Sequence, residues 1–164
     1  MKDTTSIGAA AVHIVCADLL LAGYKAFIAP EGLHYDVILD SEGKLFRIQV
    51  KSTLRPRVRS GRPSALPTYQ FTTMRNARPT KSGKINLKSY AESEVDLFAC
   101  VAIDIRAVAY LPVIGKFLTG IHLYPPGTES WLRSGRNERR RIDEFPITDH
   151  IGPTELHRIS WEAQ

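Results

Sequence analysis

The chain has 164 residues, of which 43% are hydrophobic and 24% are charged. This composition is typical of one globular domain that buries its own core, and it excludes a chain that is disordered throughout. The net charge of +5 indicates an anionic partner, because a surplus of basic residues attracts nucleic acids and other polyanions.

The first apolar stretch, residues 7–22, is interrupted by His13 and Asp18 and has no basic leader before it. It predicts a helix rather than a signal peptide, and no apolar run is long enough to cross a membrane. The two cysteines, Cys16 and Cys100, lie among apolar residues without the spacing of metal ligands, which is typical of free thiols in a reducing compartment. We therefore expect a cytoplasmic protein that does not enter membranes.

Helical periodicity predicts a first helix that Ser6 or Thr5 caps and that runs to about residue 22, where Gly23 can end it. Apolar or alternating residues indicate strands further along, at 25–29, 35–40, 45–52, 69–73, 95–105, 108–113 and 121–124. The strand at 95–105 is almost continuously apolar, which favours a central position in its sheet. Composition predicts loops at 54–67 and 76–83 and a closing helix near Pro153.

The strands at 35–40 and 45–52 flank a Ser-Glu-Gly-Lys turn and predict a hairpin. If Glu42 and Gly43 form a two-residue loop, Asp36 faces Gln49 and His34 faces Lys51. One face of the hairpin is then wholly apolar, with Val37, Leu39, Phe46, Ile48 and Val50. The other face carries Asp36, Ile38, Asp40, Leu45, Arg47, Gln49 and Lys51. A slip of one residue would mix the two sets, so the alternation favours this register, with a bulged turn as the alternative.

In this register Asp36, Gln49 and Lys51 share one face, with facing Cβ atoms roughly 4.5–5.5 Å apart. The Asp36 carboxylate, the Gln49 amide oxygen and the Val50 carbonyl can together ligate a hard divalent cation such as Mg²⁺, for which Mn²⁺ can substitute. Such an ion lowers the pKa of a bound water and neutralises a phosphate under attack, while Lys51 can orient that water or stabilise the transition state. We therefore predict Asp36, Gln49 and Lys51 as catalytic residues and Asp36, Gln49 and Val50 as metal ligands.

No Asp or Glu occurs between Gly43 and Ala91, whereas Lys and Arg are frequent there. This pattern predicts that segment 54–90 contacts DNA phosphates, the alternative being a flexible basic loop with no partner. The predicted DNA-binding residues, which include neighbours of Lys51 and a second basic cluster, are His34, Ser52, Thr53, Arg55, Arg57, Arg59, Arg62, Arg75, Arg78, Lys81, Lys84, Arg133 and Arg136. The arginines at 139–141 precede Asp143 and Glu144, so a self-paired surface is the alternative there.

Asp36, twelve further residues and then Gln49-Val50-Lys51 resemble the core motif of the PD-(D/E)XK nucleases, with Gln in place of the usual acid. Together with the string RIQVKST, the motif is most similar to the small group I intron-encoded homing endonucleases, and archaeal Holliday junction resolvases share the scaffold. The resemblance covers about residues 6–113. It implies an α/β fold, a restriction-endonuclease-like mixed β-sheet flanked by helices, in a single domain 1–164 whose last part, 114–164, adds accessory loops and the closing helix.

The same resemblance implies a Mg²⁺-dependent DNA endonuclease of the homing or resolvase type. It would act on double-stranded or branched DNA as a homo-oligomer, a dimer or tetramer, because cutting two strands needs two sites. Two positions depart from the family pattern: Tyr35 stands before Asp36 in place of Pro, and Val12 occupies the helix position where such nucleases often carry Glu. Because the site would then hold one carboxylate, a catalytically silent DNA-binding protein and a basic module that binds RNA or a protein partner are the alternatives.

Overall fold

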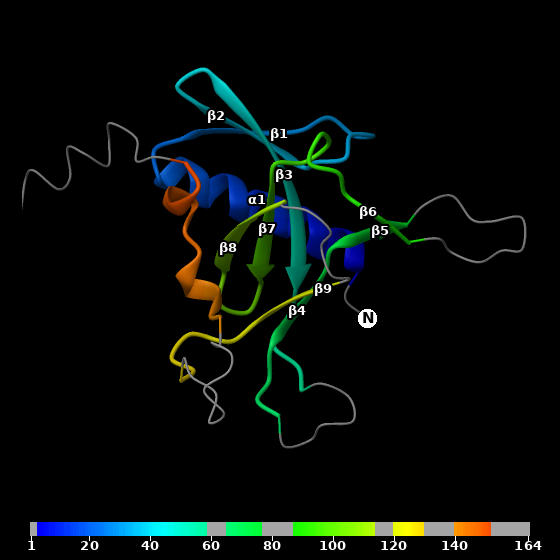
Figure 1. Cartoon of the computed structure of the whole chain (residues 1–164), viewed down its shortest axis with the longest axis vertical. Coiled ribbons are helices and arrows are strands. Elements are labelled where there is room, and N and C mark those ends of the chain that lie inside the picture. Colours follow the sequence, from blue (N-terminus) through cyan, green and yellow to red (C-terminus); the bar gives the residue numbers. More distant parts are fainter. Residues whose placement is uncertain (1–2, 59–64, 77–86, 114–119, 130–139, 152–164) are drawn as a thin grey trace, which may run out of the picture.

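The first helix begins at Thr4, three residues before the apolar stretch that predicted it. In this computed structural model, which describes residues 3–58, 65–76, 87–113, 120–129 and 140–151, α1 spans Thr4–Leu21 (Figure 1). The Asp3 carboxylate caps it by accepting hydrogen bonds from the backbone N–H groups of Thr5 and Ser6 at 3.1 and 3.3 Å. The prediction that Ser6 or Thr5 caps the helix was therefore wrong, because the acid two and three residues earlier reaches these unpaired donors first. Gly23 ends the helix as predicted, with a φ of 84°.

One face of the apolar helix α1 packs on the sheet. By length and composition alone, with a mean hydropathy of 1.6 over 18 residues, α1 could cross a membrane. In the fold its residues Ala11, Val15 and Leu19, which recur at helical spacing, are fully buried. They pack on the sheet, whereas Leu20 and Leu21 near the end of the helix are 56% and 89% exposed, so α1 covers the sheet with one face only.

The main sheet has five strands in the order β1-β2-β3-β7-β8, in which β3 and β7 are parallel and all other neighbours are antiparallel. Its strands are β1 (Lys25–Ile28), β2 (Val37–Ser41), β3 (Lys44–Thr53), β7 (Leu97–Ala102) and β8 (Ala107–Pro112). Two antiparallel pairs accompany it, β4 (Tyr69–Thr72) with β9 (Gly120–Leu123), and β5 (Met74–Asn76) with β6 (Leu87–Ser89). Short 3₁₀ helices, η1 (Ile142–Glu144) and η2 (Ile147–Asp149), follow.

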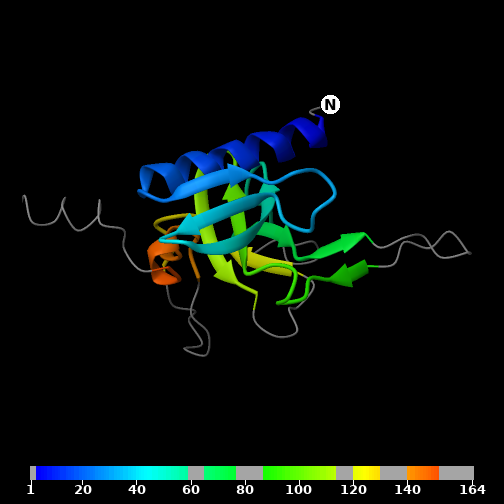
Figure 2. The ribbon, with the colours of Figure 1, turned by 90° about the horizontal axis from the view of Figure 1, so that it is seen from above.

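All seven predicted strands are present, with ends shifted by a few residues. The β5–β6 pair was missed, and the predicted loop beginning at Asn76 was wrong at that residue, because three-residue strands with Arg75 and Lys88 opposite each other show no apolar alternation. In both views this pair projects away from the five-stranded sheet (Figures 1 and 2). The closing helix predicted near Pro153 lies outside the described residues.

The sheet separates two apolar cores. Successive residues of β7 alternate between them: Leu97, Ala99 and Val101 belong to the core under α1, and Phe98, Cys100 and Ala102 belong to the opposite core. Tyr69 and Phe71 of β4 and Leu123 of β9 complete the second core, so this strand pair covers the face that α1 does not (Figure 2). Because β7 is buried on both faces and paired on both edges, its central position is confirmed.

The hairpin β2–β3 has the predicted register. Ser41 pairs with Lys44 and Val37 with Ile48, and the turn residues Glu42 and Gly43 have φ values of 53° and 87°. These left-handed values belong to a two-residue turn that matches the twist of the strands, so the bulged alternative does not apply. The face predicted to be apolar packs under α1, with Val37, Leu39, Ile48 and Val50 buried.

Two leucines of this hairpin allow a matched test of the packing. Leu39 is fully buried under α1, whereas Leu45 on the other face is 64% exposed. We expect Leu39→Ala to lower the free energy of unfolding by about 2–5 kcal/mol and Leu45→Ala to change it by less than about 0.5 kcal/mol. Urea denaturation of both variants measures these values, and equal losses would contradict the register.

Candidate active site

The hairpin brings Asp36, Gln49 and Lys51 to the sheet face that points away from α1. Asp36 immediately precedes β2, and its N–H donates at 2.9 Å to the carbonyl of Ile48, the residue that pairs with Val37. Gln49 and Lys51 alternate along β3 with the buried residues of the α1 side, and all three polar side chains are half-buried. The sequence prediction that these residues share one face agrees with this arrangement.

Three oxygen-bearing groups converge beside Asp36. Its Oδ2 accepts hydrogen bonds from the Val50 N–H at 2.9 Å and from Gln49 Nε2 at 2.5 Å. Gln49 Nε2 also donates to the Val50 carbonyl oxygen at 3.2 Å. The electropositive amide nitrogen thus lies between two of the predicted ligand oxygens, which is where a cation would be attracted. A half-turn of the Gln49 amide would add Oε1 as the third oxygen.

The surroundings shift the pKa values of both charged groups. Burial raises the pKa of the Asp36 carboxyl, and the Val50 N–H and the charge of Lys51 oppose this shift. Burial lowers the pKa of the Lys51 ammonium, while the charge of Asp36 opposes it. Each group therefore holds its charge at a desolvation cost that its partner offsets only in part.

Tyr90 directs the Lys51 side chain. Lys51 Nζ donates a hydrogen bond to the Tyr90 hydroxyl at 2.9 Å and lies 4.6 Å from the centroid of the Tyr90 ring. The ring in turn meets Phe98 edge to face, with centroids 5.5 Å apart. Burial raises the pKa of Tyr90, so its hydroxyl stays protonated at neutral pH. Tyr90 thereby anchors the Lys51 ammonium to the apolar core.

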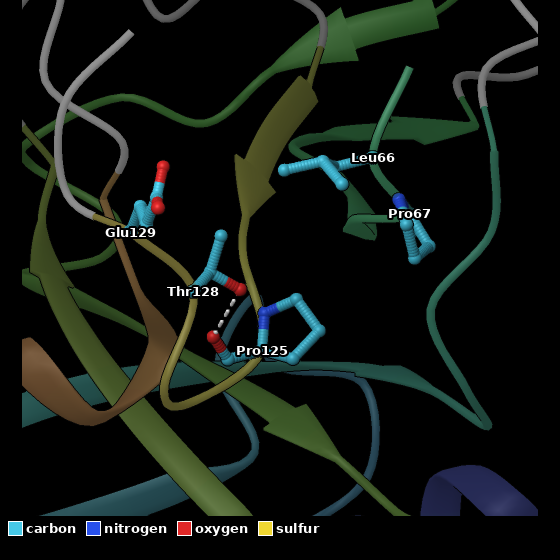
Figure 3. Close-up of a pocket in the computed structure, with 5 residues that line it drawn as sticks. All are labelled: Leu66, Pro67, Pro125, Thr128 and Glu129. Atoms are coloured by element: carbon cyan, nitrogen blue, oxygen red, sulfur yellow. Dashed lines mark hydrogen bonds between the residues drawn. The ribbon is translucent and has the colours of Figure 1, made fainter. Parts of the chain in front are cut away.

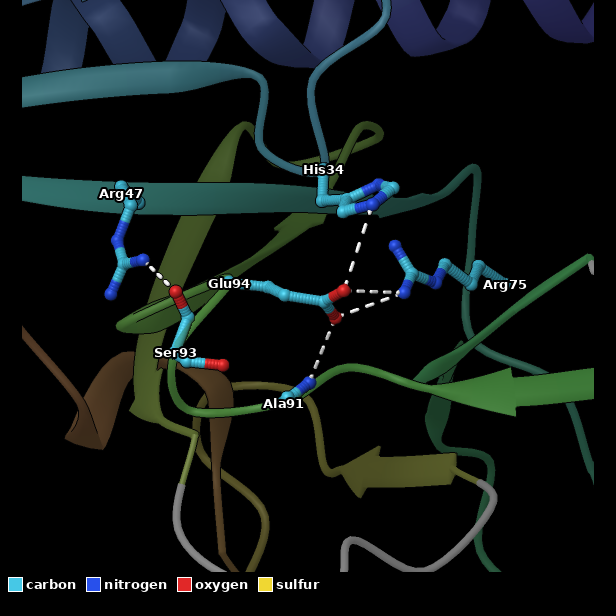
Figure 4. A network of polar contacts seen from close by, with 6 residues as sticks. All are labelled: His34, Arg47, Arg75, Ala91, Ser93 and Glu94. Carbon is cyan, nitrogen blue, oxygen red and sulfur yellow. Dashed lines mark hydrogen bonds and ion pairs between the residues drawn. The ribbon is translucent and has the colours of Figure 1, made fainter.

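Glu94 gathers a second set of charges, those of His34 and Arg75 (Figure 4). Arg75 Nη2 donates to both carboxylate oxygens of Glu94, at 2.8 and 2.9 Å, and His34 Nε2 lies 3.6 Å from Glu94 Oε1. The Ala91 N–H donates to Glu94 Oε2 at 3.1 Å. The hydrogen bonds from Arg75, followed by the one from Ala91, lower the pKa of Glu94. His34 and Arg75, both predicted to bind DNA, are thus tied to one acid.

Arg47 holds the turn that carries Glu94. Its backbone N–H and Nε donate to Asp96 Oδ2 at 2.7 and 2.9 Å, and Nη2 donates to Oδ1 at 2.8 Å. Its guanidinium also donates to the Ser93 carbonyl (Figure 4) and to the Glu92 carbonyl. Sequence reasoning missed Glu94 and this role of Asp96. A usable signal was present, because residues 92, 94 and 96 are the first acids after the acid-free stretch.

The remaining predicted DNA contacts fall into separate groups. Ser52, Thr53 and Arg57 line a cavity of about 440 Å³ at the end of β3, together with Thr4, Ile7, Leu54, Gln70 and Thr72. Arg55 is exposed beside it. Arg141 pairs with Asp143 and Glu144, which supports the self-paired alternative for that residue. Seven predicted contacts lie outside the described residues: Arg59, Arg62, Arg78, Lys81, Lys84, Arg133 and Arg136.

The donor set at Asp36 suits a hard cation. Within the described residues no group of three His, Cys, Asp or Glu side chains could hold a metal, so the candidate ligands are one carboxylate, one amide and one carbonyl. Mg²⁺ commonly takes one or two protein carboxylates and completes its shell with water and substrate phosphate, so this set fits it. Val12 packs against the apolar core under α1 and supplies no ligand, which leaves the site with the single acid that its sequence implied.

A second cavity, of about 410 Å³, is lined by Leu66, Pro67, Pro125, Thr128 and Glu129 (Figure 3). Its rim is braced by the hydrogen bond from Thr128 Oγ1 to the Pro125 carbonyl at 2.8 Å. None of the predicted catalytic residues lines it, so the chemistry is assigned to the hairpin face and not to this cavity.

Comparisons with known proteins identify the family and the fold. The family model described as PD-(D/E)XK endonuclease matches residues 2–124. Among solved structures, the bacterial homing endonuclease I-Ssp6803I is similar, with a TM-score of 0.68 and 19% sequence identity over 99% of this chain and 97% of that one. No curated protein matches the chain. The structural likeness confirms the predicted restriction-endonuclease-like fold.

The charged forms of Asp36 and Asp96 have opposite effects on the stability of the fold. Burial raises the pKa of Asp36, so its charged form destabilises the fold at neutral pH, and Asp36→Asn is expected to raise the free energy of unfolding at pH 7. The gain should fade as the pH falls toward 3.8, where the unfolded carboxyl also becomes protonated.

Asp96 is the control of opposite sign. Although burial opposes it, the hydrogen bonds from Arg47 lower the pKa of Asp96, so Asp96→Asn should destabilise the fold at pH 7, and the loss should shrink as the pH falls through the lowered pKa. Urea denaturation at several pH values measures both variants. Destabilisation by Asp36→Asn at pH 7 would contradict this account of the site.

Proposed function

The chain belongs to the PD-(D/E)XK endonuclease family, and from this premise we propose that it is a metal-dependent nuclease that hydrolyses phosphodiester bonds in DNA. The observation that carries the proposal is the meeting of Asp36, the Gln49 amide and the Val50 carbonyl beside the Lys51 ammonium. A carboxylate with a raised pKa, two further oxygen-bearing groups and a lysine ammonium on one half-buried face form a combination that is common at catalytic sites.

The proposed ligands are Asp36 Oδ2, Gln49 Oε1 and Val50 O, with Mg²⁺ as the ion and Mn²⁺ as its substitute. A bound divalent ion would lower the pKa of a bound water and neutralise negative charge on the phosphate. The reaction joins the water oxygen to phosphorus as the water releases one proton to solvent, and it breaks the bond to one ester oxygen, which takes up a proton from solvent as it leaves.

Lys51 orients the attacking water in this proposal. The Tyr90 hydroxyl accepts a hydrogen bond from the ammonium at 2.9 Å, and the charge of Asp36 favours the charged form of Lys51. Because burial lowers the pKa of Lys51, its ammonium gives up a proton more readily than that of an exposed lysine. Lys51 can therefore orient the water by hydrogen bonding as the bond between its oxygen and phosphorus forms.

Double-stranded or branched DNA is the proposed substrate. The acid-free stretch, the cavity lined by Ser52, Thr53 and Arg57, and the net charge of +5 all favour phosphate contacts. The similarity to a homing endonuclease supports a homing or resolvase type. We also propose a homo-oligomer, a dimer or tetramer, because cleavage of both strands needs two sites, and a cytoplasmic location.

The first test is cleavage of supercoiled plasmid and of a pool of random duplexes, with Mg²⁺, Mn²⁺ or chelator. We expect metal-dependent nicking that falls roughly 10²-fold or more in Asp36→Ala and in Lys51→Ala, because each removes a group that acts on the attacking water. Leu45→Ala, on the same face at the exposed hairpin tip, is the control and should nick at the wild-type rate. Retention of duplex without cleavage under any condition would instead favour the catalytically silent DNA-binding protein.

Replacing Gln49 by the usual acid tests the ligand set separately. Gln49→Glu adds a second carboxylate beside Asp36, so we expect Mn²⁺ to bind about tenfold more tightly, since ligand charge sets affinity for hard cations. Gln49→Ala should weaken binding. Isothermal titration calorimetry measures both dissociation constants, and equal affinity in wild type and the two variants would remove Gln49 from the site.

A further inference from the structure

Arg75 occupies an unusual place for a residue of a basic surface. It comes from β5, yet its side chain is only 15% exposed, and its guanidinium carbon lies 5.3 Å from the centroid of the Tyr90 ring. Lys51 Nζ lies 4.6 Å from the same centroid. Two cations from distant strands thus share one aromatic ring, and the charge of Arg75 further lowers the pKa of Lys51.

The contact between Arg75 and Glu94 leaves part of the guanidinium unused. A side-on pair would employ two nitrogens, one for each carboxylate oxygen. Here Nη2 alone donates to both oxygens of Glu94. Nη1 is buried and has no hydrogen-bond partner among the described residues. A buried cationic donor without an acceptor is costly, and an acceptor that arrives with a ligand would remove this cost.

The nature of that ligand follows from the neighbours. Lys51 and Arg75 both direct positive charge toward the region beside Tyr90, and the charge of Asp36 acts on Tyr90 as well. An oxyanion is the acceptor that a guanidinium and an ammonium bind together, and a planar guanidinium suits a phosphate oxygen. Resting on the proposed function, the oxyanion here is a phosphodiester of DNA.

We propose that Arg75 is a further catalytic residue, which donates from Nη1 to a non-bridging oxygen of the scissile phosphate, and that Glu94 is the positioning residue that holds it there. Glu94 fixes Nη2 and thereby the plane of the guanidinium. Arg47 fixes the turn that carries Glu94 through its bonds to Asp96 and Ser93. As the water attacks, negative charge grows on the non-bridging oxygens, and Arg75 stabilises it.

The test compares binding with catalysis in the full chain. We expect Arg75→Lys and Arg75→Ala to lower the single-turnover rate of plasmid nicking at saturating protein by roughly 10²-fold or more, because each removes an aligned donor to the transition state. Plasmid affinity, measured with Ca²⁺, should fall by less than about threefold, as for the loss of one phosphate contact among many. Lys25→Ala on the edge strand β1 removes the same charge from an exposed position and should leave the rate unchanged.

Glu94→Gln separates positioning from contact. It keeps the side-chain shape but weakens the hold on Nη2, so we expect a rate loss smaller than that of Arg75→Ala. The double variant should be no slower than Arg75→Ala, because Glu94 acts through Arg75. Additive losses, or wild-type nicking by Arg75→Ala, would overturn the proposal.

A direct probe keeps the test independent of cleavage. The side-chain Nε–Hε resonance of Arg75, assigned with Arg75→Lys, is followed by NMR while the dinucleotide TpT, which carries one phosphodiester, is added with Ca²⁺. A saturable shift in wild type and in Lys25→Ala supports the contact. If the Arg75 resonance does not move, the proposed contact between Arg75 and the phosphate is wrong. If the wild type never nicks DNA, the proposed catalysis fails on these substrates, while the TpT titration still decides the role of Arg75.

Discussion

The two-residue turn at Glu42 and Gly43 is the constraint on which the site depends. Both residues adopt left-handed backbone angles, and the Asp40 carboxylate accepts a hydrogen bond from the Gly43 N–H at 2.8 Å. This turn sets the pairing of β2 with β3, and with it which side chains meet α1 and which meet the opposite side. A shift of one residue would place Asp36 and Gln49 on different faces and would bury polar groups under α1. The register of this hairpin therefore determines both the apolar core under α1 and the candidate active site on the opposite face.

The polar face is a chain of coupled charges rather than a set of independent residues. Asp36 and Lys51 are both half-buried, and each is charged at a cost that the other offsets in part. Tyr90 links Lys51 to Arg75, and Glu94 links Arg75 to His34. Loss of any one member is therefore felt by its neighbours, which is common where residues are arranged for chemistry and at some expense of stability.

Local patterns in the sequence were sufficient for part of this structure. The hairpin, its register and the shared face of Asp36, Gln49 and Lys51 follow from a period of two residues and one turn. The central position of β7 follows from its continuous apolar run. The cap by Asp3 was missed because Thr5 and Ser6 are equally good cap residues, and only the backbone path decides between them. The β5–β6 pair was missed because its strands are too short to show a period.

The polar network around Tyr90 could not be predicted from local sequence patterns. Tyr90 meets Lys51, and Arg75 meets Tyr90 and Glu94, only because β3 and β7 are parallel neighbours and the turn before β7 folds back on Arg47. In the acid-free stretch Arg75 is one of many basic residues that could contact phosphate, whereas the structure gives it a half-buried acid partner. Long-range contacts of this kind depend on tertiary packing, and a single chain shows them only as scattered acids and aromatics.

Anomalous diffraction from crystals of the protein grown with Mn²⁺ and a short duplex would show directly whether Asp36, Gln49 and Val50 hold a divalent cation. The account predicts one peak near Asp36 Oδ2 and the Val50 carbonyl, at about 2.0–2.6 Å from its ligand oxygens, with the Gln49 amide turned so that Oε1 faces the ion. A peak elsewhere, or Gln49 Nε2 still donating to Asp36 at saturating Mn²⁺, would contradict the assignment of this hairpin face as a metal-dependent nuclease site.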